Sequence, residues 1–334
     1  LVIGQLQGLE LPGPAWERDV LPARIADYDP DDLEHLCLAG EVAWGRLAAA
    51  AADADGEAKR RQAPTRSAPL GLALRADLPD LLAPLDDPGP LLACCAVETQ
   101  AVFAHLATRG ASFLPDIARA IGQPPAVVEE ALWQLVAAGL VTGDGIAGLR
   151  ALLWPRDAHP PRVAHLRAVR GGAARRLMPA GRWSLLRAAD TATGSAPRAT
   201  DDEQAERTAR RLLRRWGVVF RELLARERHL PRWRALLAAL RRLEARGELR
   251  GGRFVDGFAG EQFALPEAVD ALRSLRRRAR GGETVVVSAA DPLNLVGVLN
   301  DEPRIASSEP VALRYRDGVF IGIDAPDDGF VVGR

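Results

Sequence analysis

The stretch that decides the fold is residues 97–145, VETQAVFAHLATRGASFLPDIARAIGQPPAVVEEALWQLVAAGLVTGDG. Apolar residues recur here at helical spacing in three segments, which are separated by glycine and proline breaks. We therefore predict helices at Val97–Thr108, Leu114–Ile121 and Pro125–Ala138. An extended segment starts at Leu140, and Gly143-Asp144-Gly145 predicts a hairpin tip. Helix, short helix, turn, helix and hairpin is the order of a winged helix, a variant of the helix-turn-helix.

The same order recurs towards the carboxyl end of the chain, which indicates an internal repeat. The predicted elements are helices at Asp201–Trp216, Phe220–Arg226 and Leu230–Arg246 and a hairpin over Glu248–Leu265. Near the amino end the pattern shows only half of this unit, a helix at Asp29–Leu38 and a strand at Glu41–Trp44. We expect the missing helices to lie upstream of the chain.

After Thr284 the pattern becomes strand-like, and Arg316-Asp317-Gly318 predicts a hairpin turn. The predicted fold class is α+β, with tandem winged-helix (helix-turn-helix) modules followed by a small β-barrel-like domain. The expected domains are a first, partial module with its linker at 1–90, a winged helix at 91–155, a linker at 156–200, a winged helix at 201–280 and the β domain at 281–334. The linker of the first module is expected at Ala48–Pro69, where alanine, aspartate and arginine dominate.

Composition limits the classes of function. The 334 residues include 48% hydrophobic residues, enough to bury cores, and 44 basic residues balance 44 acidic ones, so any polyanion site must be local. Three cysteines without zinc spacing and the lack of a long apolar run favour a reduced, cytoplasmic protein without membrane contact. The chain starts at Leu1 and its one methionine is Met178, so we expect a piece of a longer protein.

The third helix of a winged helix usually meets nucleic acid, which makes its outward face the first candidate site. In the later module this face carries the nucleic-acid-binding candidates Arg232, Arg234, Arg241 and Arg242, to which we add Arg24 from the amino-terminal block. In the earlier module the same face carries Glu129 and Glu130, which would repel phosphates and favour protein packing instead. Arginines on an exposed helix face are also compatible with plain solvation and ion pairing. The sequence has neither the G-x-x-x-x-G-K-[ST] phosphate loop nor a G-x-S-x-G elbow, so we expect no cofactor in this chain.

Several uncommon motifs resemble one protein family. They are Ala15-Trp16-Glu17-Arg18-Asp19-Val20-Leu21-Pro22-Ala23-Arg24, Leu36-Cys37-Leu38-Ala39-Gly40-Glu41-Val42-Ala43-Trp44, Gly181-Arg182-Trp183-Ser184-Leu185, Ala290-Asp291-Pro292-Leu293-Asn294 and Tyr315-Arg316-Asp317-Gly318. They resemble the region that follows the helicase core in Lhr-type (large helicase-related) superfamily 2 DNA helicases. The resemblance implies DNA repair, an ATP- and Mg-dependent 3'-5' helicase core upstream in the same chain, single-stranded DNA or RNA-DNA hybrids as partners, and homo-oligomers formed through this region.

A second resemblance covers three residues. Gln5-Leu6-Gln7 is similar to the motif of AlkZ-type DNA glycosylases, which implies Gln5 and Gln7 as catalytic residues that hold the attacking water. The alternatives to a binding and assembly region are therefore a glycosylase for uracil or alkylated bases and, third, a winged-helix transcription regulator. A regulator should carry basic recognition helices in each repeat, and the glutamine motif is equally compatible with an ordinary polar segment.

Overall fold

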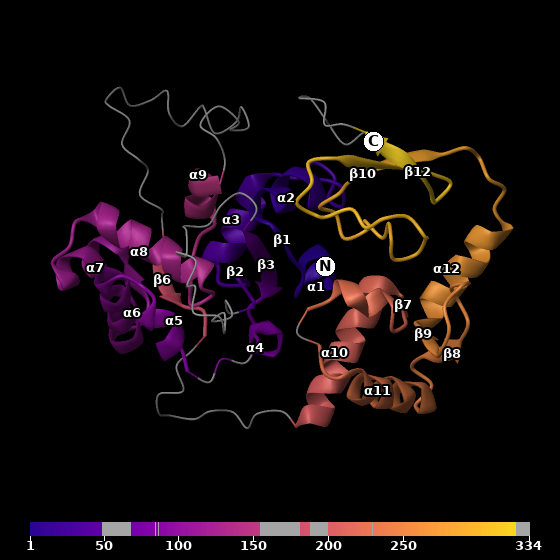
Figure 1. Cartoon of the computed structure of the whole chain (residues 1–334), viewed down its shortest axis with the longest axis horizontal. Helices are drawn as coiled ribbons and strands as arrows, with labels where there is room; N and C mark the ends of the chain where they lie inside the picture. Colours follow the sequence, from indigo (N-terminus) through magenta and orange to yellow (C-terminus); the bar gives the residue numbers. More distant parts are fainter. Residues whose placement is uncertain are drawn as a thin grey trace. The chain divides into compact units, whose positions relative to one another are not determined.

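The computed structural model describes residues 1–48, 68–83, 85, 87–153, 181–187, 200–228 and 230–324 (Figure 1). The chain forms two compact units, one of Glu10–Thr191 and one of Leu1–Leu9 with Ala192–Arg334. Most of the expected linker at Ala48–Pro69 and much of the one at 156–200 lie outside the described residues.

The unit Glu10–Thr191 begins with a three-stranded antiparallel sheet in the order β1-β3-β2. Its strands are β1 (Glu10–Pro12), β2 (Val42–Gly45) and β3 (Pro69–Leu74). Between β1 and β2 lie α2 (Gly13–Ala15), the π-helix η1 (Trp16–Val20) and α3 (Pro30–Leu38), and α4 (Leu78–Leu81) follows β3. The predicted α3 is confirmed, and the Asp29 carboxylate caps it by accepting from the amide of Asp31 at 3.0 Å. Strand β1 and the helices before α3 were not predicted, because they are too short for a periodicity signal. No described helix precedes β1 in this unit, and the expectation of a partial unit stays a prediction.

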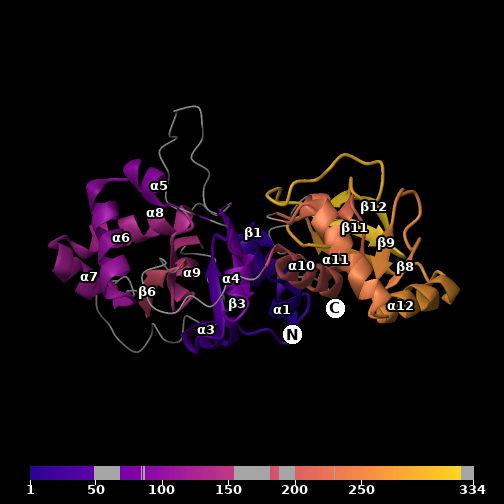
Figure 2. The same cartoon turned by 90° about the horizontal axis from the view of Figure 1, so that it is seen from below.

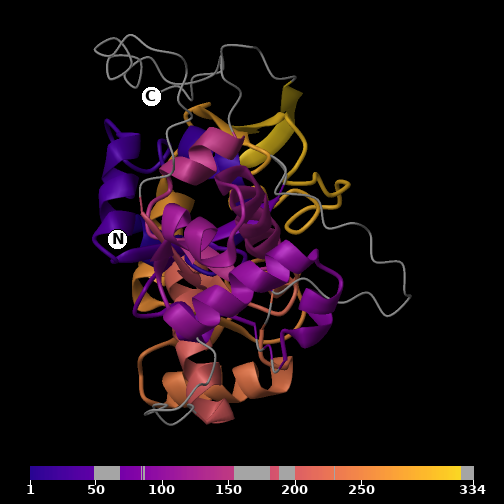
Figure 3. The same cartoon turned by 90° about the vertical axis from the view of Figure 1, so that its left-hand side faces the viewer.

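A second three-stranded sheet in the same unit has the order β4-β6-β5. The helices of this segment, drawn in purple and magenta, face the viewer in Figure 3. The elements are α5 (Gly89–Ala93), α6 (Val97–Arg109), β4 (Ser112–Phe113), α7 (Leu114–Ile121), α8 (Pro125–Ala137), β5 (Val141–Gly143), α9 (Ala147–Leu153) and β6 (Arg182–Leu185). The three predicted helices are confirmed. The predicted tight hairpin at Gly143-Asp144-Gly145 is wrong, because β5 pairs with β6, which comes from the expected linker at 156–200.

The other unit holds a third sheet, in the order β7-β9-β8 (Figure 1). Strands β8 and β9 are seen beside α12 in Figure 2. Its elements are α1 (Val2–Leu6), α10 (Asp201–Trp216), β7 (Val218–Val219), the 3-10 helix η3 (Leu223–Arg226), α11 (Trp233–Ala245), β8 (Arg250–Gly252), β9 (Gln262–Ala264) and α12 (Pro266–Arg277). A capping box between Thr200 and Glu203 starts α10 at the predicted residue. The predicted hairpin is confirmed by the pairing of Gly251 with Phe263.

All three sheets have the order first, third, second strand, and in each a short helix and then a longer helix lie between the first and the second strand. This is the winged-helix topology, and it confirms the α+β class. The helices in the third, recognition position are α3, α8 and α11. Three copies of one topology therefore account for most of the described residues.

The chain's last described strands form an open antiparallel sheet of β10 (Thr284–Ser288), β11 (Ala312–Arg316) and β12 (Val319–Asp324), in that order. The predicted turn is confirmed, with Asp317 and Gly318 at φ 49° and 79°. The barrel is not confirmed, because the described strands form no closed sheet. A loop fills the core instead of further strands, placing Ala289, Val296 and Ile305 against Leu313. None of the described helices is long and apolar enough to cross a membrane.

Candidate nucleic-acid interface

The three helices in the recognition position differ in charge. Helix α3 carries Asp31, Asp32 and Glu34, and α8 carries Glu129 and Glu130 without any basic residue. Helix α11 instead carries Arg234, Arg241 and Arg242, and Arg232 is its N-cap. Since phosphates need positive partners, α11 is the recognition-position helix in the described residues that suits nucleic acid.

Helix α8 also lacks a free outer surface along its second half. Its Trp133 is 2% exposed and packs edge-on against Trp183 of β6, with ring centroids 5.2 Å apart. Trp44 of β2 completes the cluster at 6.3 Å from both rings and donates its indole N–H to the carbonyl oxygen of Gly145 at 3.1 Å. This helix therefore serves as core, and the cluster joins the first two winged helices.

The amino end of α11 carries two exposed arginines with no described ion-pair partner, Arg232 and Arg234. The first turn of α11 contains no acidic residue. The positive end of the helix dipole lies here, so two guanidinium groups reduce helix stability. A bound anion would reverse that effect, because helix amino ends bind phosphates through free backbone N–H groups.

The other two predicted arginines of α11 are ion-paired. Arg241 donates from Nη2 to Glu261 at 2.7 Å and from Nε to the same carboxylate at 3.2 Å. Arg242 lies 3.4 Å from the Asp202 carboxylate. Exposed pairs of this kind contribute at most about 1 kcal/mol to stability and exchange readily, so either arginine would have to leave its carboxylate to bind a phosphate.

A further exposed network occupies the carboxyl end of α11. Arg246 and Arg210 both hydrogen-bond Glu206 and Glu248. These bonds lower the pKa of Glu206 and the pKa of Glu248 below their ordinary values. The network keeps both carboxylates charged, so these arginines are already neutralised.

The remaining nucleic-acid candidate, Arg24, belongs to the other unit. Its Nη1 donates to the carbonyl oxygen of Val20 at 3.0 Å, and the side chain is partly exposed. The guanidinium thus lies over the carboxyl end of η1, where a positive charge is favourable.

Gln5 and Gln7 lie at the end of α1 and are fixed through their backbone. Arg215 of α10 donates to the carbonyl oxygens of both residues, and the Gln7 residue is 3% exposed. The Arg215 guanidinium also pairs with Glu227, and Trp216 donates its indole N–H to that carboxylate at 2.7 Å. Sequence reasoning missed this buried pair, although Arg215 follows Leu212 by three residues and therefore falls on the inward face of α10.

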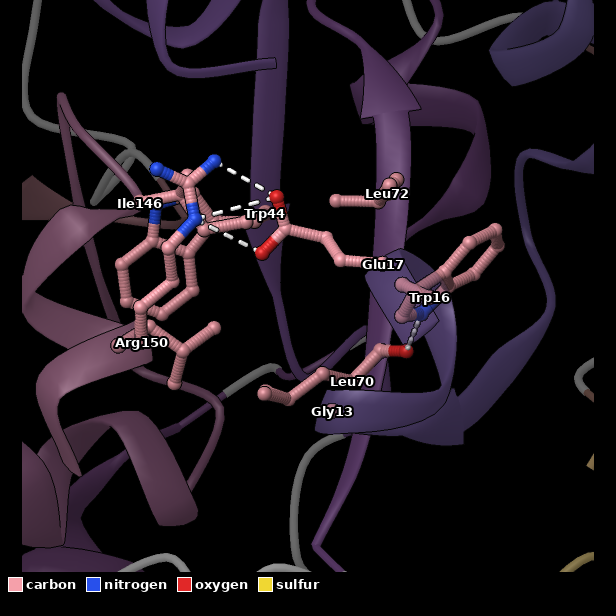
Figure 4. Close-up of a pocket in the computed structure, with 9 residues that line it drawn as sticks. Gly13, Trp16, Glu17, Trp44, Leu70, Leu72, Ile146 and Arg150 are labelled. Carbon is pink, nitrogen blue, oxygen red and sulfur yellow. Dashed lines mark hydrogen bonds and ion pairs between the residues drawn. The ribbon is translucent and has the colours of Figure 1, made fainter. Parts of the chain in front are cut away.

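A pocket in the other unit holds a buried carboxylate (Figure 4). Arg150 of α9 binds Glu17 of η1 through three hydrogen bonds of 2.6–3.1 Å, and the Tyr28 hydroxyl donates to Glu17 at 2.9 Å. Burial first, and then the Glu17 charge, raises the pKa of Tyr28. Burial lowers the pKa of Arg150, but the Glu17 hydrogen bonds together with the Glu17 and Glu34 charges raise that pKa above its ordinary value. The cavity measures about 10 Å³, room for about one water, and neither Gln5 nor Gln7 lines it.

Comparison with known proteins gives the family. Residues 198–284 match the model described as large helicase-related protein, winged-helix domain, and residues 1–59 match a second model with the same description. The Lhr helicase/uracil glycosylase of Escherichia coli (strain K12) is 31% identical over 324 residues, 89% of this chain and 19% of the relative. The Lhr helicase/probable uracil glycosylase of Mycolicibacterium smegmatis is 32% identical over 315 residues, again 89% and 19%.

The chain thus spans about one fifth of the length of the curated relatives it matches. Both models fall on segments that fold with winged-helix topology, and the likeness extends over nearly all of the chain. The chain is therefore a winged-helix region of the large helicase-related (Lhr) family.

Proposed function

We propose that this chain is the nucleic-acid-holding and assembly region of an Lhr-type DNA-repair helicase, with the amino end of α11 as its contact point. The observation that supports it most is the contrast among the three recognition-position helices. Only α11 among those described presents arginines without acidic partners, Arg232 and Arg234, at the end where the helix dipole opposes them. A nucleic-acid phosphate placed there meets both guanidinium groups and the positive end of the α11 dipole.

The test measures how tightly the chain binds labelled single-stranded DNA and a labelled RNA-DNA hybrid. Fluorescence anisotropy at low salt gives both affinities. R232A/R234A should weaken binding on the order of 10-fold and lower the dependence of affinity on salt. R210A/R246A removes the same charge from the ion-paired network of the same unit and should change affinity less than twofold. Equal effects of the two variants would contradict a site at α11.

The ion-paired arginines Arg241 and Arg242 allow a second comparison of affinities within α11. R241A/R242A should cost less affinity than R232A/R234A, because Arg241 and Arg242 are held by Glu261 and Asp202 in the free protein. If R241A/R242A were the more damaging variant, the contact would lie further along α11.

The helicase activity is proposed for the longer protein of which this chain would be a part. An ATP- and Mg-dependent 3'-5' helicase core in the same chain would move the strand, and this region would guide it. The support is the likeness to two proteins named as helicases, of which this chain matches about one fifth. Self-assembly is the second part of the proposal: the acidic faces of α3 and α8 suit protein contacts better than phosphates. Light scattering that gave the monomer mass at all concentrations would contradict it.

A second candidate function is uracil removal, because both relatives carry glycosylase in their names. Here Gln5 and Gln7 would hold the water, and the Arg215–Glu227 pair would fix their backbone. Single-stranded DNA with one uracil, incubated without ATP and then treated with alkali, should break at that position. Q5A/Q7A should abolish the break and leave single-strand affinity unchanged; retained cleavage would exclude these glutamines. A transcription regulator is less well supported, since α3 and α8 are acidic.

A further inference from the structure

Helix α12 leads into a long exposed basic segment outside the three winged-helix sheets. Every residue from 271 to 285 is exposed, and we call this segment the basic strap. It contains one acidic residue, Glu283, and five arginines: Arg273, Arg276, Arg277, Arg278 and Arg280. In a chain with no net charge, this is a strong local excess of positive charge.

Three arginines of the basic strap have no ion-pair partner among the described residues, namely Arg276, Arg277 and Arg280. The other two have weak ones: Arg273 lies 3.4 Å from Asp270, and Arg278 lies 3.8 Å from Glu283. The helix dipole favours Arg276 and Arg277 at the end of α12, but Arg280 follows the helix and gains nothing from it. Local stability therefore does not account for the whole cluster.

Both ends of the basic strap are fixed. At its start α12 is anchored by the buried Val269. At its other end the Asp317 carboxylate accepts from the amides of Gly282 at 3.0 Å and Glu283 at 3.1 Å, and the Asp317 amide donates to the carbonyl oxygen of Glu283 at 2.8 Å. The arginines are thus displayed on a tethered segment, which reduces the entropy lost when a ligand binds them.

The chemistry of the basic strap suits a polyanion better than a protein surface. Protein interfaces have an apolar centre from which charge is depleted, whereas here the exposed Leu272 and Leu275 stand singly among guanidinium groups. A row of arginines along one helix end and its extension is typical of phosphate-backbone contact.

We propose that the basic strap is a second phosphate-binding surface, which holds the backbone of a single nucleic-acid strand independently of α11. It rests on the proposed function in one respect, that the chain binds nucleic acid. It adds a site outside the recognition helix and predicts binding without base preference.

The test uses the full chain, a labelled mixed-sequence single-stranded DNA and anisotropy titrations from about 50 to about 200 mM salt. R276Q/R277Q/R280Q should lower affinity on the order of 10-fold at the low end and reduce the slope of log K against log salt by about 2. The control R210Q/R246Q/R314Q removes three charges that are ion-paired to Glu206, Glu248 and Asp324 and should leave the slope unchanged. All six arginines are exposed, so neither triple variant removes a buried contact. Thermal unfolding, followed by circular dichroism, verifies that both variants are folded.

The outcomes separate the two proposals. Loss in R276Q/R277Q/R280Q but not in the control supports the basic strap, whatever R232A/R234A does. A slope equal to that of the wild type, or equal in both triple variants, overturns the basic strap and leaves α11 untouched. If the wild type does not bind, both proposals fail. If the strap variant instead lowers the mass in light scattering while DNA affinity stays, a second copy of the chain occupies the strap and the proposal is wrong.

Discussion

The Arg215 guanidinium of α10 donates from Nε to the carbonyl oxygen of Gln5 at 3.3 Å, across 210 positions of sequence. The same side chain binds the carbonyl oxygen of Gln7 and the Glu227 carboxylate, and it is 1% exposed. Helix α1 is therefore held by a buried charge rather than by its own five residues, too few for a stable helix alone.

Replacing Arg215 by methionine should destabilise the unit that contains α10 by about 3–5 kcal/mol, because it leaves the Glu227 charge buried without its partner. Urea unfolding followed by circular dichroism measures the loss. The double variant R215M/E227Q removes the unpaired charge and keeps the acceptor for Trp216, so it should recover part of that stability. A double variant no better than R215M would show that the carbonyl contacts, not the ion pair, carry the effect.

Trp183→Ala should cost about 3–5 kcal/mol, since it removes a buried ring from a packed core. The same substitution of a tryptophan in an exposed linker would lower the free energy of unfolding by less than about 0.5 kcal/mol. Urea unfolding of the variant therefore distinguishes a central strand from the linker that the sequence predicted at 156–200. Loss of the Trp133 contact should also change the near-ultraviolet circular dichroism; an unchanged spectrum and stability would contradict the pairing of β5 with β6.

The comparison of β6 with α10 shows what a single sequence can predict. Helix α10 has sixteen residues of regular periodicity and a local cap, so its bounds follow from the sequence. Strand β6 has four residues, and its partners Ser112 and Val141 are about 70 and 40 positions away. Such pairing leaves no local signal, and the arginine, proline and glycine around it resemble a linker. Helices α6, α7, α8 and α11 were predicted for the same reason as α10, whereas β1 and β3 were missed for the same reason as β6.

The sequence predicted which helix carries the candidate arginines, but not which of these arginines are ion-paired. Spacing placed Arg232, Arg234, Arg241 and Arg242 on one exposed helix, and the structure confirms the helix. Which of them pair with carboxylates depends on Asp202 and Glu261, which other elements bring near. Charges on separate elements meet only in the folded chain, so the free and the paired arginines could not be told apart beforehand.

Cys37 should make the unit Glu10–Thr191 less stable as the pH rises above about 9. Burial, and secondarily the Glu34 charge, raises the pKa of the Cys37 thiol from 9.0 to about 12. Between these values the unfolded thiol loses its proton and the folded thiol keeps it, so stability present below pH 9 is lost at up to about 1.4 kcal/mol per pH unit. C37A should remove this loss between about pH 9 and 10, before Tyr28 titrates in the unfolded chain.

Alkylation provides an independent check on the same thiol. Iodoacetamide at mildly alkaline pH should modify the exposed Cys94 and leave Cys37 unmodified, as read by mass spectrometry of the peptides. Rapid modification of Cys37 in the folded chain would show that the thiol is neither buried nor protonated.

The loop that replaces barrel strands beside β11 depends on one buried amide. Asn294 is fully buried and donates from Nδ2 to the carbonyl oxygens of Ala289 at 2.8 Å and Ile305 at 3.0 Å, joining the two ends of the loop. Asn294→Ala leaves both carbonyls without this donor, at a cost of about 1–3 kcal/mol. Hydrogen exchange of peptides from residues 289–305 should therefore accelerate roughly 5- to 150-fold.

Asn300 is the matched control: it accepts from the amide of Gly297 at 2.7 Å but is exposed, so Asn300→Ala should accelerate exchange less than about 5-fold. Equal acceleration in both variants would mean that side-chain bonds at the surface of the loop, not the buried amide, keep it closed.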